Sequence, residues 1–118
     1  MDAGPEIKAL ARSLNLADAP QDWGITNSDP SRLEEFLQFC ETADLTPAQQ
    51  FAMGELVFAS MNDALLEGAA GDGLTDHFER FLASDLHGLP WHVQYWSSLD
   101  DEEQFPIAAL LRRLATHA

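Results

Sequence analysis

The side chains best suited to chemistry in this 118-residue chain are four histidines, one cysteine and twenty carboxylates. Catalysis by such groups needs a histidine beside a nucleophile, or two carboxylates held across a substrate. The sequence has neither the Gly-x-Ser-x-Gly turn of α/β-hydrolases nor the His-Glu-x-x-His motif of zinc proteases. Neighbouring acids arise by chance in so acidic a chain. We therefore expect no catalytic residues and no cofactor, and keep a small enzyme with carboxylate and histidine chemistry as a second alternative.

A metal site and a reactive thiol are the next possibilities. Asp85, His87 and His92 would meet around a bend, but two histidines five residues apart with Pro90 between them do not match metal-ligand spacing. Cys40 lies on the apolar stripe in the last turn of a predicted helix, where the helix dipole disfavours a thiolate. We expect no metal, a buried hydrophobic role for Cys40, a capping role for His87 and a half-buried ring at His92.

The charge of the chain is its most informative total. Twenty acids against six bases give a formal net charge of −14, and the span from Leu33 to Glu79 holds ten acids and no Lys or Arg. Such a chain repels nucleic acid and anionic membrane surfaces, and no apolar run approaches the length of a membrane span. It favours fast encounter with a basic protein. We expect the acids of this span to face the terminal segments, solvent, a cation or another protein.

The hydrophobic pattern predicts an all-α chain: a single helical domain over 1–118, with five to six short helices in a compact bundle around a central helix near residues 47–67. Thr46, Pro47 and Gln49 give the central helix a capping-box start, and Gly68 ends it. That helix is apolar over most of its circumference, so we expect neighbours on more than one side. Further helices are predicted over about 3–16, 30–41, 75–84 and 90–99 and from 106 onward, with loops over 17–29 and 68–73.

Three features inside these helices bear on function. The segment Trp91–Trp96 alternates like a strand but also has helical spacing, and we predict a helix because a lone strand has no sheet to join. Gly54 in the central helix predicts the close approach of another helix. Leu56 shares the polar face of that helix with Asp63 and Glu67, which predicts an exposed apolar contact ringed by carboxylates.

Size, charge and helical architecture favour a binding protein. We expect a small acidic protein-binding module, an inhibitor of the immunity type that occludes a basic partner protein such as a toxin or nuclease. The alternative is a structural or regulatory homo-oligomer without catalytic activity, for example a homodimer. The N-terminus lacks signal-peptide features and the single thiol suits a reducing compartment, so we expect a cytoplasmic location. Carboxylates would attract the partner and large apolar side chains would anchor it. The candidate contacts are Leu56, Asp63, Glu67, Trp23, Trp91, Trp96, Asp100, Asp101, Glu102 and Glu103.

Overall fold

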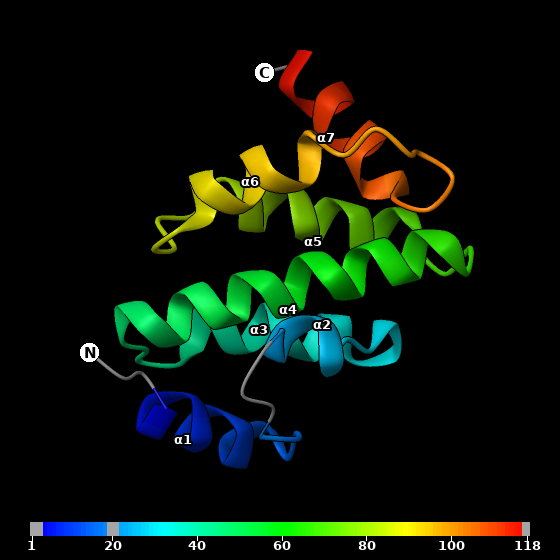
Figure 1. The fold of residues 1–118 in the computed structure, drawn as a ribbon. Helices are drawn as coiled ribbons and strands as arrows, with labels where there is room; N and C mark the ends of the chain where they lie inside the picture. The colour runs from blue at the N-terminus through cyan, green and yellow to red at the C-terminus, as the bar shows by residue number, and fades with distance from the viewer. Residues whose placement is uncertain (1–3, 19–21, 117–118) are drawn as a thin grey trace.

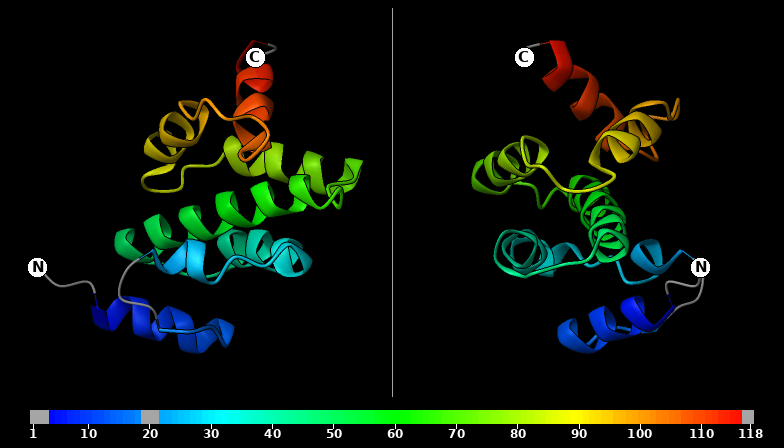
Figure 2. Two further views of the ribbon diagram at one scale, coloured as in Figure 1. Left: turned by 45° about the vertical axis from the view of Figure 1, so that its right-hand side comes forward. Right: turned by 90° about the vertical axis from the view of Figure 1, so that its left-hand side faces the viewer.

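One long helix, α4 (Pro47–Leu66), runs through the middle of the molecule, and the other helices lie on two sides of it (Figure 1). The computed structural model describes residues 4–18 and 22–116. The other elements are α1 (Gly4–Leu14), α2 (Trp23–Thr26), the 3-10 turn η1 (Pro30–Arg32), α3 (Leu33–Thr42), α5 (Asp72–Leu82), α6 (Leu89–Ser97) and α7 (Pro106–Thr116). Helices α1, α2 and α3 lie on one side of α4, and α5, α6 and α7 on the other (Figure 2). The described residues contain no strand, so the predicted all-α class is confirmed.

The start of α4 follows from its own sequence. The Thr46 hydroxyl accepts a hydrogen bond from the Gln49 backbone N–H at 3.3 Å, and the Gln49 side chain accepts one from the Thr46 N–H at 3.0 Å. This is the predicted capping box, followed by Pro47 in the first turn. Ten of the twenty residues of α4 are buried, which two-sided coverage allows.

Helix α2 covers the side of α4 that the sequence suggested was open. Residues 17–29 were predicted as a loop, but they include this one helical turn, and a Cβ added to Gly24 would lie 2.5 Å from the Leu56 backbone nitrogen. The Gly24 N–H also donates to the Glu55 carboxylate at 2.7 Å. The prediction that Leu56 is an exposed contact is therefore wrong, because its side chain is 0% exposed beneath α2.

The chain reaches α3 through a capped turn. The Asp29 carboxylate accepts a hydrogen bond from the Ser31 backbone N–H at 3.0 Å, so Asp29 and Pro30 start a helical segment as predicted, with η1 preceding α3. Residues 43–46 then turn the chain back, and α3 and α4 run antiparallel (Figure 1). These two helices therefore form an antiparallel hairpin.

Helix α5 begins earlier than predicted. Its N-cap is Gly71, whereas the predicted helix starts at Thr75. Thr75 lies in the first turn of α5 and donates its hydroxyl proton to the Gly71 carbonyl at 3.1 Å. The glycine-rich stretch hides this start because glycine has no side chain with which to signal a cap. Asp85 is exposed in the segment between α5 and α6.

The segment Trp91–Trp96 is helical, as predicted, and forms most of α6. Gly88 precedes it with φ 82°, and a side chain at Gly88 would collide with the Phe51 ring. The acidic turn at 100–103 leads into α7 at Pro106, also as predicted. Across the described residues, no helix combines the length and the apolar character that crossing a membrane requires.

Candidate protein-binding surface

His92 fixes α6 against α4. Its ring is 0% exposed, more deeply buried than the half-buried position predicted, and its Nε2–H donates to the Phe51 carbonyl at 2.9 Å. Gly54 makes this possible, since a Cβ there would lie 2.5 Å from His92 Cδ2. The predicted close approach at Gly54 is confirmed. Burial lowers the pKa of His92, against the smaller raising effect of its bond to Phe51, so the ring is neutral with its hydrogen on Nε2.

Because His92 points into the core, another side of α6 faces solvent. Trp91 and Tyr95, one helical turn apart, are 53% and 46% exposed. Their rings stack with centroids 5.3 Å apart and planes 5° from parallel, and Phe51 supports Trp91 at 5.3 Å. We name the exposed surface of Trp91 and Tyr95 the aromatic face. Two adjoining, half-exposed aromatic rings held in one geometry are a feature of interaction sites.

The aromatic face lies in an uncharged stretch bounded by acids. Residues 86–99 include no Asp, Glu, Lys or Arg. Asp85 precedes this stretch and the acidic turn at 100–103 follows it, and all of these acids are exposed. Helix α6 has nine residues and is therefore about 13 Å long. Exposed carboxylates thus precede and follow, in the sequence, the short helix that carries the aromatic face, and a protein interface likewise combines an apolar centre with a polar rim.

The predicted aromatic and leucine anchors divide into buried and exposed groups. Trp23, Leu56 and Trp96 are core residues with 6%, 0% and 5% exposure. They cannot reach a partner while the chain is folded, so the prediction that they are partner contacts is wrong. Trp91 is exposed, and Tyr95 accompanies it. Sequence reasoning did not nominate Tyr95, although its position four residues after Trp91 on a predicted helix was the available signal.

The predicted acidic contacts differ in what they already bind. Asp63 accepts a hydrogen bond from the Ser28 hydroxyl at 2.7 Å. Asp101 accepts the backbone N–H groups of residues 103 and 104, each at 3.1 Å, and Glu102 pairs with Arg112 at 3.3 Å. The candidates Glu67, Asp100 and Glu103 are exposed.

Asn62 joins the acidic turn to α4. Its side-chain nitrogen donates to the Gln104 carbonyl at 3.2 Å, and its oxygen accepts from the Ile107 N–H at 3.2 Å. The segment that directly follows the acidic turn is therefore anchored to the central helix.

His77 is a polar feature that sequence reasoning missed. Its Nδ1 lies 2.7 Å from a Glu34 carboxylate oxygen, and its Nε2 makes a second hydrogen bond to Glu41. A carboxylate only accepts, so both ring nitrogens carry hydrogen and the ring is an imidazolium. Burial acts to lower the pKa of His77, but the bonds to Glu41 and Glu34 together hold it above its ordinary value. The acid-rich span therefore contains a cation of its own, which binds α5 to α3 and leaves neither ring nitrogen free for a substrate.

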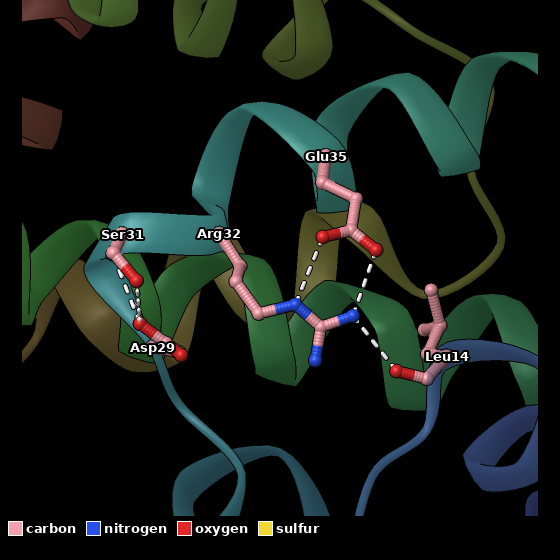
Figure 3. A network of polar contacts seen from close by, with 5 residues as sticks. All are labelled: Leu14, Asp29, Ser31, Arg32 and Glu35. Atoms are coloured by element: carbon pink, nitrogen blue, oxygen red, sulfur yellow. Dashed lines mark hydrogen bonds and ion pairs between the residues drawn. The ribbon is translucent and has the colours of Figure 1, made fainter.

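Arg32 is used to join α1 to the start of α3. Its Nε and Nη2 donate to the two Glu35 oxygens at 2.8 and 2.7 Å, and Nη2 also donates to the Leu14 carbonyl at 2.7 Å (Figure 3). The guanidinium carbon lies 5.1 Å from the centre of the Phe36 ring. The bidentate pair raises the pKa of Arg32 and lowers the pKa of Glu35.

Arg112 likewise binds inside the molecule. It donates to the carbonyls of Ser97 and Leu99 at 3.1 and 2.5 Å and pairs with Glu102. These contacts close the C-terminal end of α6 against α7. Two of the six bases therefore neutralise one neighbouring carboxylate each and are not free to offset the other acids.

A cleft of about 550 Å³ lies between the ends of α3 and α5. Glu41, Asp44, Asp85 and Arg80 line it, with Cys40 in its wall. Burial raises the pKa of the Cys40 thiol to about 12, so the thiol is protonated and is a poor nucleophile. Mixed charge and an inert thiol give this cleft no clear ligand preference.

Fold and surface together define an acidic, all-helical protein with an exposed aromatic face. Comparison of the chain with protein-family models, with curated proteins and with solved structures finds no match.

Proposed function

We propose that this chain is an acidic protein-binding module that occludes the working surface of a basic protein, as an inhibitor of the immunity type. The observation that carries the proposal is the net charge of −14. Arg32 and Arg112 form ion pairs inside the fold and so do not offset the remaining acids. A toxin or nuclease that acts on an anionic substrate has the complementary positive surface. Carboxylates of this chain would stand in for the charge of that substrate and speed the encounter. A cytoplasmic location is part of the proposal, and the lone thiol of Cys40 supports it.

The homo-oligomer alternative has less support. The surface that would favour it is the apolar circumference of α4, and helices of the same chain bury most of that surface. In a dimer, each copy would have a net charge of −14. Repulsion between the two copies opposes association unless the acids are neutralised. Light scattering separates the two, because a dimer that persists at every salt concentration favours the homo-oligomer.

Affinity capture from the native host, at about 50 and 500 mM salt, tests the proposal, because added salt screens attraction between exposed charges. The captured partner is then purified and its association rate with the chain is measured by stopped flow. We expect a partner of positive net charge whose association slows as salt increases, and whose own activity stops in the complex. Recovery of this chain alone at both salt concentrations refutes the proposal, as does a partner that remains active when bound.

A further inference from the structure

We infer that the aromatic face is the docking site for an arginine side chain in a basic segment of the partner protein. This inference rests on the proposed function and adds to it a surface and a residue preference. Trp91 and Tyr95 are 53% and 46% exposed, and the negative quadrupole of an aromatic ring face attracts a cation.

The molecule leaves this cation site open. Among the described residues, the cation–π contact formed is that of Arg32 over Phe36, on a different helix. The stretch 86–99, which carries the aromatic face, has no Lys or Arg of its own to cover the rings. In the part of the chain that the structure describes, no cation–π contact to Trp91 or Tyr95 is formed, and we assign this role to a cation from the partner.

The charges around the aromatic face favour a basic occupant. Asp85 at one end of α6 and Asp100 and Glu103 at the other are exposed carboxylates. They would attract further basic residues on either side of the docked side chain. A second copy of this chain would place its own acids against them, so charge complementarity favours a basic protein segment.

Arginine fits the aromatic face better than lysine. The guanidinium is planar and weakly hydrated and stacks flat on an aromatic ring, whereas the ammonium of lysine is a strongly hydrated point charge. Trp91 and Tyr95 stack on each other with planes 5° from parallel, so a guanidinium would stack on an outer face of this pair and extend it. The preference for arginine over lysine at equal charge is therefore the distinguishing property of the site.

Two synthetic peptides test the inference on the full chain. One has six alternating arginine and glycine residues and the other has lysine in place of arginine, with both ends blocked. Six extended residues reach roughly 20 Å, enough to cross α6. Calorimetry gives the two dissociation constants, and nitrogen-15 NMR follows the indole N–H of Trp91, assigned by its loss in Trp91→Phe.

We expect the arginine peptide to bind about threefold to tenfold more tightly than the lysine peptide and to shift the Trp91 indole N–H. The double variant Trp91→Ala, Tyr95→Ala should lose this preference while its charge is unchanged. Ile25→Ala is the matched control, because Ile25 is a 47% exposed apolar residue on α2, and this variant should keep the preference.

Equal affinities for the two peptides, or an unmoved Trp91 indole signal, overturn the inference. The NMR result needs no variant and so does not depend on the folding of one. If both peptides bind equally and added salt weakens them, the aromatic face is excluded and the proposed function stands. If neither peptide binds at low salt, the inference fails, and the capture experiment decides the proposed function separately.

Discussion

Replacing His77 with glutamine should destabilise the fold in a pH-dependent way. The substitution removes the imidazolium that joins α5 to α3 and leaves Glu34 and Glu41 without it. Glutamine is similar in size and can still donate a hydrogen bond, but it carries no charge. The variant therefore isolates the contribution of the charged ring.

The expected magnitude follows from the exposure of the three side chains. A hydrogen bond between charged groups contributes about 1.5–3 kcal/mol when it is well buried, and an exposed ion pair about 0.2–1 kcal/mol. The carboxylates of Glu34 and Glu41 are 60% and 53% exposed, while His77 is 11% exposed. We therefore take the upper part of the exposed range for each contact and expect His77→Gln to lower the free energy of unfolding by about 1–2 kcal/mol.

The direction of the pH dependence follows from the raised pKa of His77. The folded chain binds the second ring proton more tightly than the unfolded chain does. The resulting stabilisation is complete below the ordinary histidine pKa of about 6.5 and is lost as the pH rises through the folded-state pKa. The difference between the native chain and His77→Gln should thus be largest near pH 6 and fall by about half or more near pH 9.5.

Urea unfolding followed by far-UV circular dichroism at those two pH values measures this difference. His87→Gln is the matched control, because His87 is exposed in the turn before α6 and its replacement should have little effect at either pH. An equal difference at both pH values, or a larger one in alkali, refutes the reasoning. Either result would mean that the His77 ring acts by packing and not by its charge.

Other predictions follow from the same geometry. Gly54→Ala should destabilise the fold by about 1–3 kcal/mol in urea unfolding, because the added methyl group meets His92. The control is Gly73→Ala in α5, where a Cβ has nothing within 4 Å, and this variant should be neutral or stabilising. Equal effects of the two substitutions would contradict the packing of His92 on Gly54. The pKa of His92 is lowered in the folded chain, so the stability contributed by the neutral ring should be lost as the pH falls below about 6.5. In thermal melts, the difference in melting temperature between the native chain and His92→Gln should therefore shrink in acid. A difference that grows in acid would show that the His92 ring is charged. The Cys40 thiol, with its pKa raised to about 12, should react with a disulfide reagent about 100-fold or more slowly in the folded chain than in urea; similar rates would contradict its burial.

The helical frame could be predicted because its signals are local. The capping box at Thr46, the cap at Asp29 and the proline at Pro106 each act within a few residues of the helix start that they specify. Where such a local signal is absent, the helix start was predicted at the wrong residue. Gly71 caps α5 without a side chain, and the sequence therefore pointed instead to Thr75.

The surface could not be predicted in the same way, because it depends on contacts between distant residues. Leu56 has polar neighbours along α4, but Gly24, 31 residues before Glu55, brings α2 over it. The apolar residues around most of α4 predicted neighbours on more than one side of this helix. That pattern was the better guide to the burial of Leu56 than the polar face on which Leu56 lies. His77 meets Glu34 and Glu41 across 43 and 36 residues, separations that no helical spacing reveals.

The aromatic face depends on the same helix contact that stabilises the core. Helix α6 is oriented by His92 against Gly54, and that orientation turns Trp91 and Tyr95 toward solvent in one stacked geometry. Gly54→Ala should therefore reduce the preference for the arginine peptide, although it leaves both rings and every charge in place. A reduced preference, measured by the same calorimetry in a variant that circular dichroism shows to be folded, would mean that recognition depends on how α6 is held. An unchanged preference would mean that exposure of the two rings is sufficient, whatever the position of α6 against α4.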